Sequence, residues 1–142
     1  MNRTILVVDH NQAVRSQVRC ALSDEQCDVF EADDGVEAFR RLNDGLKPEL
    51  IIASIEAARE EGVNLIRAIR QISAYRHTPI LILDAEAGGG VRTDWKEAGG
   101  TCCILGPFEN SELLEKIRLL MSLISAKERE DEFSFTKDKI YR

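Results

Sequence analysis

Short apolar runs alternate with amphipathic segments along most of the chain. The run Thr4–Val8 is continuous and rich in β-branched residues, which is typical of a strand buried on both faces. Leu50–Ala53, Pro79–Leu83 and Thr101–Leu105 have the same character. Cys27–Glu31 alternates more, which favours a strand at the edge of a sheet. The pattern therefore predicts five strands, with the second at an edge.

Helical periodicity fills the segments between these runs. The first helix follows Asn11, a good capping residue, and the second follows Asp34. A third is expected over Gly62–Ile72, a short fourth over Val91–Ala98, and a last one from Asn110 or the serine after it. In the second helix, three apolar residues are expected to point inward: Val36, Phe39 and Leu42.

Strand and helix alternate five times, which predicts an α/β fold with a parallel sheet and right-handed crossovers. For a chain this short we expect a flavodoxin-like three-layer sandwich, with strand order 2-1-3-4-5 and helices on both faces. Ligands of such sheets bind beyond the carboxyl ends of the strands. The candidate site residues at that edge are Asp9, His10, Ser54, Glu56, Asp84 and Gly106.

The 142 residues suffice for one domain, which we place at residues 1–126. Lys127–Glu132 is a run of charged residues, and apolar residues return after it. We therefore expect a charged C-terminal tail or linker over residues 127–142. It is either a frayed or truncated end, or a docking segment for a partner or for the domain itself.

Composition excludes several classes of function. A net charge of −6 argues against a nucleic-acid-binding protein, and no apolar run reaches the length of a membrane span. Four cysteines lack metal-binding spacing, which indicates free thiols in a reduced, cytoplasmic protein. They are Cys20, Cys27, Cys102 and Cys103.

Catalytic motifs are absent from the predicted site. The turn after the first strand has no glycines for a dinucleotide and no phosphate-binding loop follows. Ser54, His10 and Asp9 invite comparison with a hydrolase, but no GxSxG elbow presents the serine, and Asp9 adjoins His10 too closely to orient it. We therefore expect no enzyme, with a serine hydrolase as the weakest hypothesis.

From Thr4 to Ser125 the chain resembles the receiver domain of two-component response regulators, such as the chemotaxis regulators. The motifs that carry the resemblance are "ILVVDHN", "DGVEAFRRL", "ELIIASIEAAREEGVNLIRAIR", "TPILILDAEA" and "AGGTCCILGPF". The resemblance implies a cytoplasmic signalling module of a phosphorelay that binds a protein partner. It also implies a cis peptide bond before Pro107.

The residues that carry the family's chemistry differ in this chain. Ser54 stands where receivers have the phosphoacceptor aspartate, and His10 replaces the second acid that helps to hold Mg²⁺. Asp84 replaces a hydroxyl residue, Gly106 replaces a lysine, and Cys103 replaces an aromatic switch residue. An acyl phosphate needs a carboxylate nucleophile. The sequence therefore predicts a degenerate pseudo-receiver that acts by phosphorylation-independent protein–protein interaction.

The alternative function is a sensor of a small ligand or divalent cation. Asp9, Glu56 and Asp84 would then bind Mg²⁺ or Ca²⁺ weakly, and otherwise we expect no cofactor. Two other arrangements stay open, because Arg59 or Arg92 could neutralise these acids or water could solvate them.

The resemblance assigns partner binding to the face made by the fourth helix, the fifth strand and the last helix. On this chain the face includes Trp95, Thr101 and Cys103. An exposed Trp95 would be a binding anchor, whereas a buried one would cover the core. Neither the oligomeric state nor the identity of the partner can be predicted.

Overall fold

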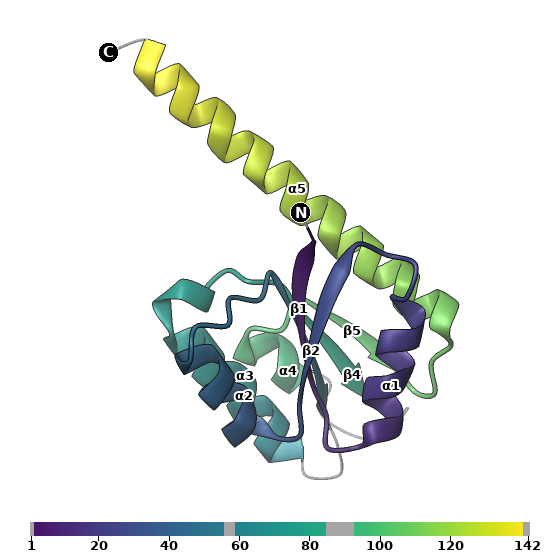
Figure 1. Ribbon diagram of the computed structural model, residues 1–142. Helices are drawn as coiled ribbons and strands as arrows, with labels where there is room; N and C mark the ends of the chain where they lie inside the picture. The colour runs from purple at the N-terminus through teal and green to yellow at the C-terminus, as the bar shows by residue number, and fades with distance from the viewer. Residues whose placement is uncertain (1, 56–58, 85–92, 141–142) are drawn as a thin grey trace.

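The computed structural model describes the backbone of residues 2–55, 59–84 and 93–140 (Figure 1). Strands and helices alternate along the chain as the apolar pattern predicts. In chain order, the elements are β1 Arg3–Val8, α1 Gln12–Ala21, β2 Cys27–Ala32, α2 Gly35–Asn43, β3 Leu50–Ile55, α3 Arg59–Gln71, the 3₁₀ turn η1 Ser73–Tyr75, β4 Ile80–Asp84, α4 Thr93–Ala98, β5 Cys102–Leu105 and α5 Asn110–Ile140.

The five strands form one parallel sheet in the order β2-β1-β3-β4-β5, which confirms the predicted topology. β2 lies at an edge, as its alternating sequence indicates. Its exposed residues, Asp28 and Phe30, alternate with partly buried ones. All five residues of β4 are buried, because helices cover both faces of the sheet there.

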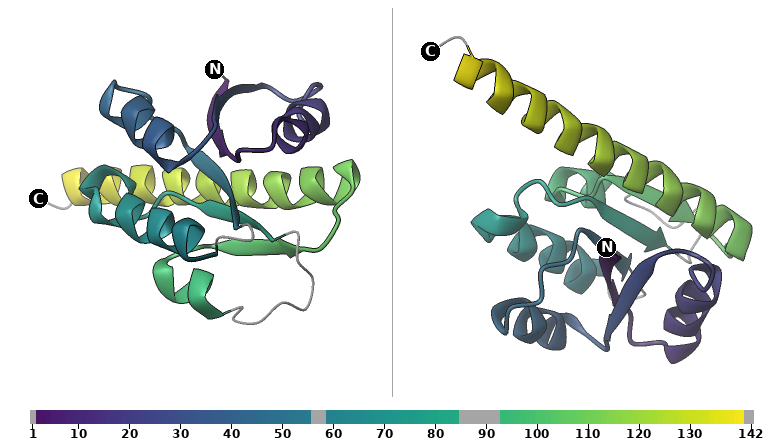
Figure 2. Two further views of the ribbon diagram at one scale, coloured as in Figure 1. Left: turned by 90° about the horizontal axis from the view of Figure 1, so that it is seen from below. Right: turned by 45° about the horizontal axis from the view of Figure 1, so that its top comes forward.

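Two apolar cores flank the sheet, because successive residues of a strand point to opposite faces. Leu6 and Ile51 belong to the core beneath α2, α3 and α4, whereas Ile5 and Ile52 belong to the core beneath α1 and α5 (Figure 2). Each fully buried leucine or isoleucine contributes roughly 1.5–3 kcal/mol to stability. The two cores fix the strand ends from which the site is built.

Local capping starts the helices where the sequence indicates. The Asn11 side chain accepts the backbone N–H of Ala13, and the Asp34 side chain accepts that of Glu37 at 2.8 Å. The prediction that Val36 points inward is wrong, since this side chain is 69% exposed. It lies in the first turn of α2, and the buried stripe of this helix contains Ala38 instead.

The expected cis peptide bond before Pro107 is also wrong, because the described residues contain no cis bond. Gly106 adopts a φ of 72°, a left-handed conformation that glycine reaches without strain. Its N–H donates to the carbonyl of Asp84 at 2.7 Å. The chain therefore turns at Gly106 with a trans bond to the proline.

α5 runs far past the body of the domain (Figure 1). Arg3 at the start of β1 attaches α5 to the sheet. Its guanidinium donates to Ser125 Oγ at 2.7 Å and to Glu128 at 2.9 Å. The predicted tail thus continues the helix as far as Ile140, and the domain boundary at residue 126 stays a prediction. No described helix is both long and apolar enough to cross a membrane.

Candidate functional site

The candidate site lies at the carboxyl edge of the sheet, which we call the rim. Asp9 directly follows β1, Ser54 is the next-to-last residue of β3, Asp84 ends β4, and Gly106 directly follows β5. The strand register sets Val8 beside Ala53, so Asp9 comes next to Ser54. It also sets Asp84 between β3 and β5. The sequence prediction that these four positions converge is consistent with this register.

Two carboxylates of the rim are buried. The exposed fraction is 4% for Asp9 and 3% for Asp84. Asp9 Oδ1 accepts the N–H of Asn11 at 2.9 Å, so one of its oxygens stabilises the turn into α1. His10, the neighbour of Asp9, is exposed. A buried acid is costly unless hydrogen bonds or a cation compensate it, so these two residues dominate the chemistry of the rim.

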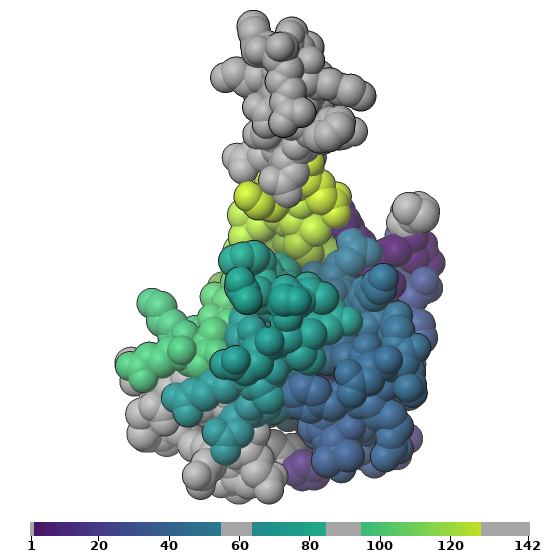
Figure 3. Space-filling model, turned by 90° about the vertical axis from the view of Figure 1, so that its left-hand side faces the viewer, coloured from purple at the N-terminus to yellow at the C-terminus, as the bar shows by residue number. Residues whose placement is uncertain are grey.

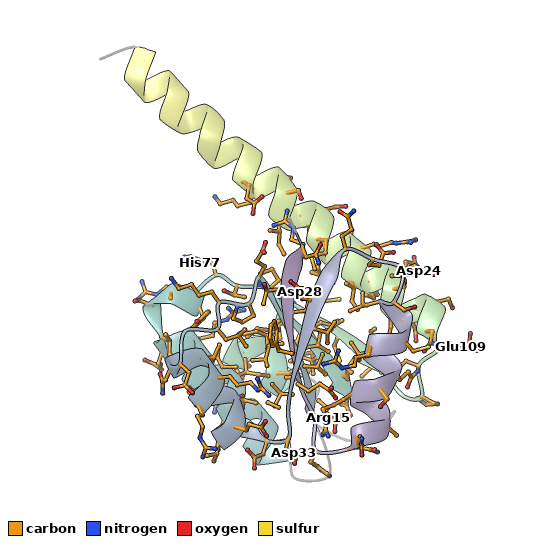
Figure 4. The ribbon with its side chains drawn as sticks, in the orientation of Figure 1. Arg15, Asp24, Asp28, Asp33, His77 and Glu109 are labelled. Atoms are coloured by element: carbon orange, nitrogen blue, oxygen red, sulfur yellow. The ribbon has the colours of Figure 1, made fainter. Side chains whose placement is uncertain are left out.

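The guanidinium of Arg15 on α1 lies near the rim, but most of its hydrogen bonds are to carboxylates outside the rim. Arg15 Nη1 donates to the backbone carbonyl of Asp9 at 2.5 Å and to Asp33 Oδ1 at 2.7 Å. Its Nε donates to Glu31 at 3.0 Å (Figure 4). The positive charge of Arg15 is thus shared with carboxylates of β2 and the loop after it. It does not replace the lysine that receivers carry at the position of Gly106.

Ser54 is partly buried and makes no side-chain hydrogen bond within the described part of the chain. A serine hydroxyl is a weak nucleophile unless a base takes its proton. No such base contacts Ser54 among the described residues. The geometry therefore gives no support to the hydrolase hypothesis.

The predicted cation site depends on a residue that is not described. Glu56 lies outside the described residues, as do Arg92 and the side chain of Arg59. Among the described side chains, no group of three His, Cys, Asp or Glu residues is arranged to hold a metal ion. A site made of Asp9, Glu56 and Asp84 stays a prediction.

Of the three residues assigned to the interaction face, Trp95 lies in α4, Cys103 lies in the edge strand β5, and Thr101 directly precedes β5. Trp95 and Cys103 are partly buried and pack against the core beneath α2, α3 and α4. The Trp95 ring lies so close to Gly100 that an added Cβ there would be 2.8 Å from its Cε3. Thr101 Oγ1 accepts the N–H of Ile80 at 3.0 Å. All three residues thus have structural contacts beside any role in binding.

Sequence reasoning missed Arg70, which joins α3 to the α4–β5 junction. Its guanidinium donates to three carbonyls: Gly99 at 2.7 Å, Tyr75 at 2.8 Å and Thr78 at 2.6 Å. Burial lowers the pKa of this arginine. In the sequence it is one basic residue in the last turn of a helix, which normally indicates solvent exposure. Its partners are backbone groups, which no residue pattern reveals.

The chain matches the family described as the response regulator receiver domain over residues 5–118. It is 33% identical over 132 residues to response regulator MprA of Mycobacterium sp. (strain KMS), covering 93% of this chain and 56% of that protein. It is 28% identical to chemotaxis protein CheY1 of Helicobacter pylori, covering 82% of this chain and 95% of that protein. The chain thus spans little more than half the length of its MprA relatives.

Solved structures agree with this assignment. Chemotaxis response regulator CheY4 of Vibrio cholerae superposes with a TM-score of 0.76 at 28% identity, covering 84% of this chain and 99% of that one. A response regulator from Thermotoga maritima gives a TM-score of 0.77 at 30% identity, covering 86% and 99%. Fold, sequence and rim position therefore agree that the chain belongs to the response regulator receiver domain family.

Proposed function

We propose that this receiver domain transmits a signal by binding a protein partner without being phosphorylated. The observation that carries the proposal is the identity of the rim residues. Ser54 is the next-to-last residue of β3, Asp84 ends β4, and Gly106 directly follows β5. In receivers these positions supply the phosphoacceptor, a hydroxyl and a lysine.

Each replacement removes one part of phosphoryl transfer. The Ser54 hydroxyl cannot form an acyl phosphate, and no described base activates it. Asp84 brings a buried negative charge where a phosphoryl group would need hydrogen-bond donors. The loss of the lysine at Gly106 removes a cation that would balance the charge of that group.

The backbone at Gly106 supports the same conclusion. Its φ of 72° belongs to a region in which a residue with a side chain is strained by about 1–2 kcal/mol. The turn after β5 is therefore shaped for glycine. A lysine could return here only with strain or with a change of the turn.

The partner would contact the α4–β5–α5 face, which includes Trp95, Thr101 and Cys103. The chain would have no catalytic activity of its own and would act in the cytoplasm. Any switching would require a ligand that binds two states of the domain with different affinity, because the phosphoryl ligand is missing. Regulation through the amount of the protein would need no such ligand.

The test is a capture experiment with the full chain as bait in an extract of its source cells. Proteins captured by the wild type are compared with and without acetyl phosphate and Mg²⁺. The same partner at the same yield in both samples is expected. Binding that depends on acetyl phosphate would contradict the proposal.

A matched pair of variants locates the face. Trp95→Phe keeps an aromatic ring at the partly buried position on α4 but removes part of the indole, whereas Lys96→Ala changes an exposed neighbour. We expect the first to weaken capture and the second to leave it unchanged. Equal capture by both variants would indicate that the partner binds another face of the domain.

The alternative function, a sensor of a divalent cation or small ligand, is favoured by the burial of Asp9 and Asp84. A ligand that binds the folded state raises the melting temperature. Mg²⁺ or Ca²⁺ should then stabilise the wild type and have a smaller effect on Asp84→Asn. Equal melting temperatures with and without each cation would exclude the cation sensor.

A further inference from the structure

Among the described residues, the surface at the end of α2 and around η1 carries four cations against two acids, Glu37 and the α2 cap Asp44. We call it the basic face, and define it by Arg40, Arg41, Lys47 and Arg76. Three of these residues are exposed, and Arg41 is partly buried. His77, also exposed, follows Arg76 (Figure 4). The whole chain by contrast is acidic, with a net charge of −6.

Backbone and side-chain hydrogen bonds join the parts of the basic face. The N–H of Leu46 donates to the carbonyl of Arg41 at 3.0 Å, which folds the loop back on α2. Tyr75 Oη donates to the carbonyl of Leu46 at 2.9 Å, which brings η1 against the same loop. Lys47 and Arg76 directly follow these two residues. Figure 3 shows α2, α3 and η1 together on one side of the molecule.

The arginines on the opposite side of the domain are neutralised. Arg15 and Arg19 form ion pairs with Glu31, and Arg118 pairs with Glu25 at 2.5 Å. Carboxylates of the same domain therefore neutralise the charge of these arginines.

Most cations of the basic face lack such compensation. Arg41 lies 3.6 Å from Glu37, but Arg40, Lys47 and Arg76 form no ion pair within the described part of the chain. Arg41 Nε is moreover buried without a hydrogen-bond acceptor in this part of the chain. Arg40, Lys47 and Arg76 are thus available to an external partner, whereas the three arginines named on the opposite side are paired.

The helix dipole explains only part of this charge. Arg40 and Arg41 lie in the last turn of α2, where cations interact favourably with the dipole. Lys47 lies in the loop after α2 and Arg76 follows η1, so neither belongs to the last turn of an α-helix. The exposed side chains Arg40, Lys47 and Arg76 are therefore free to meet an external anion.

We propose that the basic face binds an acidic segment of a partner protein. An extended polyanion such as a nucleic acid would also meet the acidic side of this domain, which includes Asp24, Asp28 and Glu109 (Figure 4). A short acidic segment need only match the four cations. The proposal does not depend on whether Ser54 can be modified, and it concerns a surface away from the α4–β5–α5 face.

The probe is a fluorescein-labelled peptide of ten glutamates, and its anisotropy is measured with the full chain at low salt. Lys47→Glu with Arg76→Glu reverses two charges of the basic face. Lys116→Glu with Arg118→Glu makes the same change of net charge on α5. Because close charge pairs determine such complexes, we expect the first double variant to weaken binding about tenfold or more, and the second less than about threefold.

Circular dichroism confirms that both double variants are folded. Equal weakening by the two would show that only net charge matters and would overturn the proposal. Lack of binding to the wild type at low salt would overturn it too. An oligothymidine of similar charge that bound more tightly, with the same dependence on Lys47 and Arg76, would assign the face to nucleic acid instead of protein.

Discussion

Charged side chains are paired at one end of the sheet and are mainly acidic at the other. At the amino end, Arg3 forms ion pairs with Glu49 and Glu128 and also donates to Ser125 Oγ. At the carboxyl end, Asp9 and Asp84 are buried at a rim where Gly106 supplies no cation. One end joins β1, β3 and α5 with opposite charges, and the other collects acids.

This difference separates stability from function. Hydrogen bonds with Glu128 and Glu49 raise the pKa of Arg3, and the bond from Arg3 lowers the pKa of Glu128. Both directions indicate interactions that favour the charged forms in the folded state. The amino end thus stabilises the fold, whereas the rim acids Asp9 and Asp84 are not part of the two apolar cores.

The largest effect is expected from Arg3→Ala. This change breaks the ion pair and the hydrogen bond that hold α5 against β1, and also the ion pair with Glu49 before β3. Its partners are partly exposed, so solvent screening limits the loss to about 1–2 kcal/mol in the free energy of unfolding. Urea denaturation measures it. A loss no greater than that of Arg118→Ala, which breaks a surface pair with Glu25, would contradict the role of the amino end.

Gly106→Lys tests whether the backbone conformation at this rim position disfavours a side chain. The positive φ should make this variant about 1–2 kcal/mol less stable, although lysine is the residue that receivers have there. Gly106→Ala is the matched control, since it brings the same strain without the charge. Equal losses are expected for both. A lysine variant that is more stable than the alanine variant would reveal that the rim acids gain a cation.

Acid should weaken the fold through its paired glutamates. Hydrogen bonds from Arg19 and Arg15 lower the pKa of Glu31, and Arg3 lowers that of Glu128. An unfolded glutamate has a pKa of about 4.3, so this stability is present above that pH and is lost as pH falls through the lower folded values. Unfolding experiments between about pH 7 and pH 3 should show the decline. In Arg3→Ala the decline should be shallower.

The smallest effect is expected from Ser54→Ala. Its hydroxyl makes no hydrogen bond within the described residues, so the change in stability should stay within about 0.5 kcal/mol. Capture of the partner should also be unchanged. A large loss of either would give Ser54 a role that its contacts do not indicate.

The apolar pattern predicted the sheet order because each buried strand leaves a periodic signal that does not depend on distant contacts. The prediction that Asp9, Ser54 and Asp84 converge rests on topology alone, and the strand register is consistent with it. Arg3 and Arg70 could not be found in this way, because their partners lie far along the chain or are backbone carbonyls. The turn at Gly106 was missed because the resemblance implied a cis bond, whereas the left-handed glycine makes the turn with a trans bond.

The central part of the proposed function is that the rim does not accept a phosphoryl group. The direct measurement is the intact mass of the purified chain after incubation with acetyl phosphate and Mg²⁺, supported by fluorine NMR with beryllium fluoride. We expect no added phosphoryl mass and no bound fluoride signal. A stoichiometric adduct that disappears in Ser54→Ala or Asp9→Asn would contradict the claim.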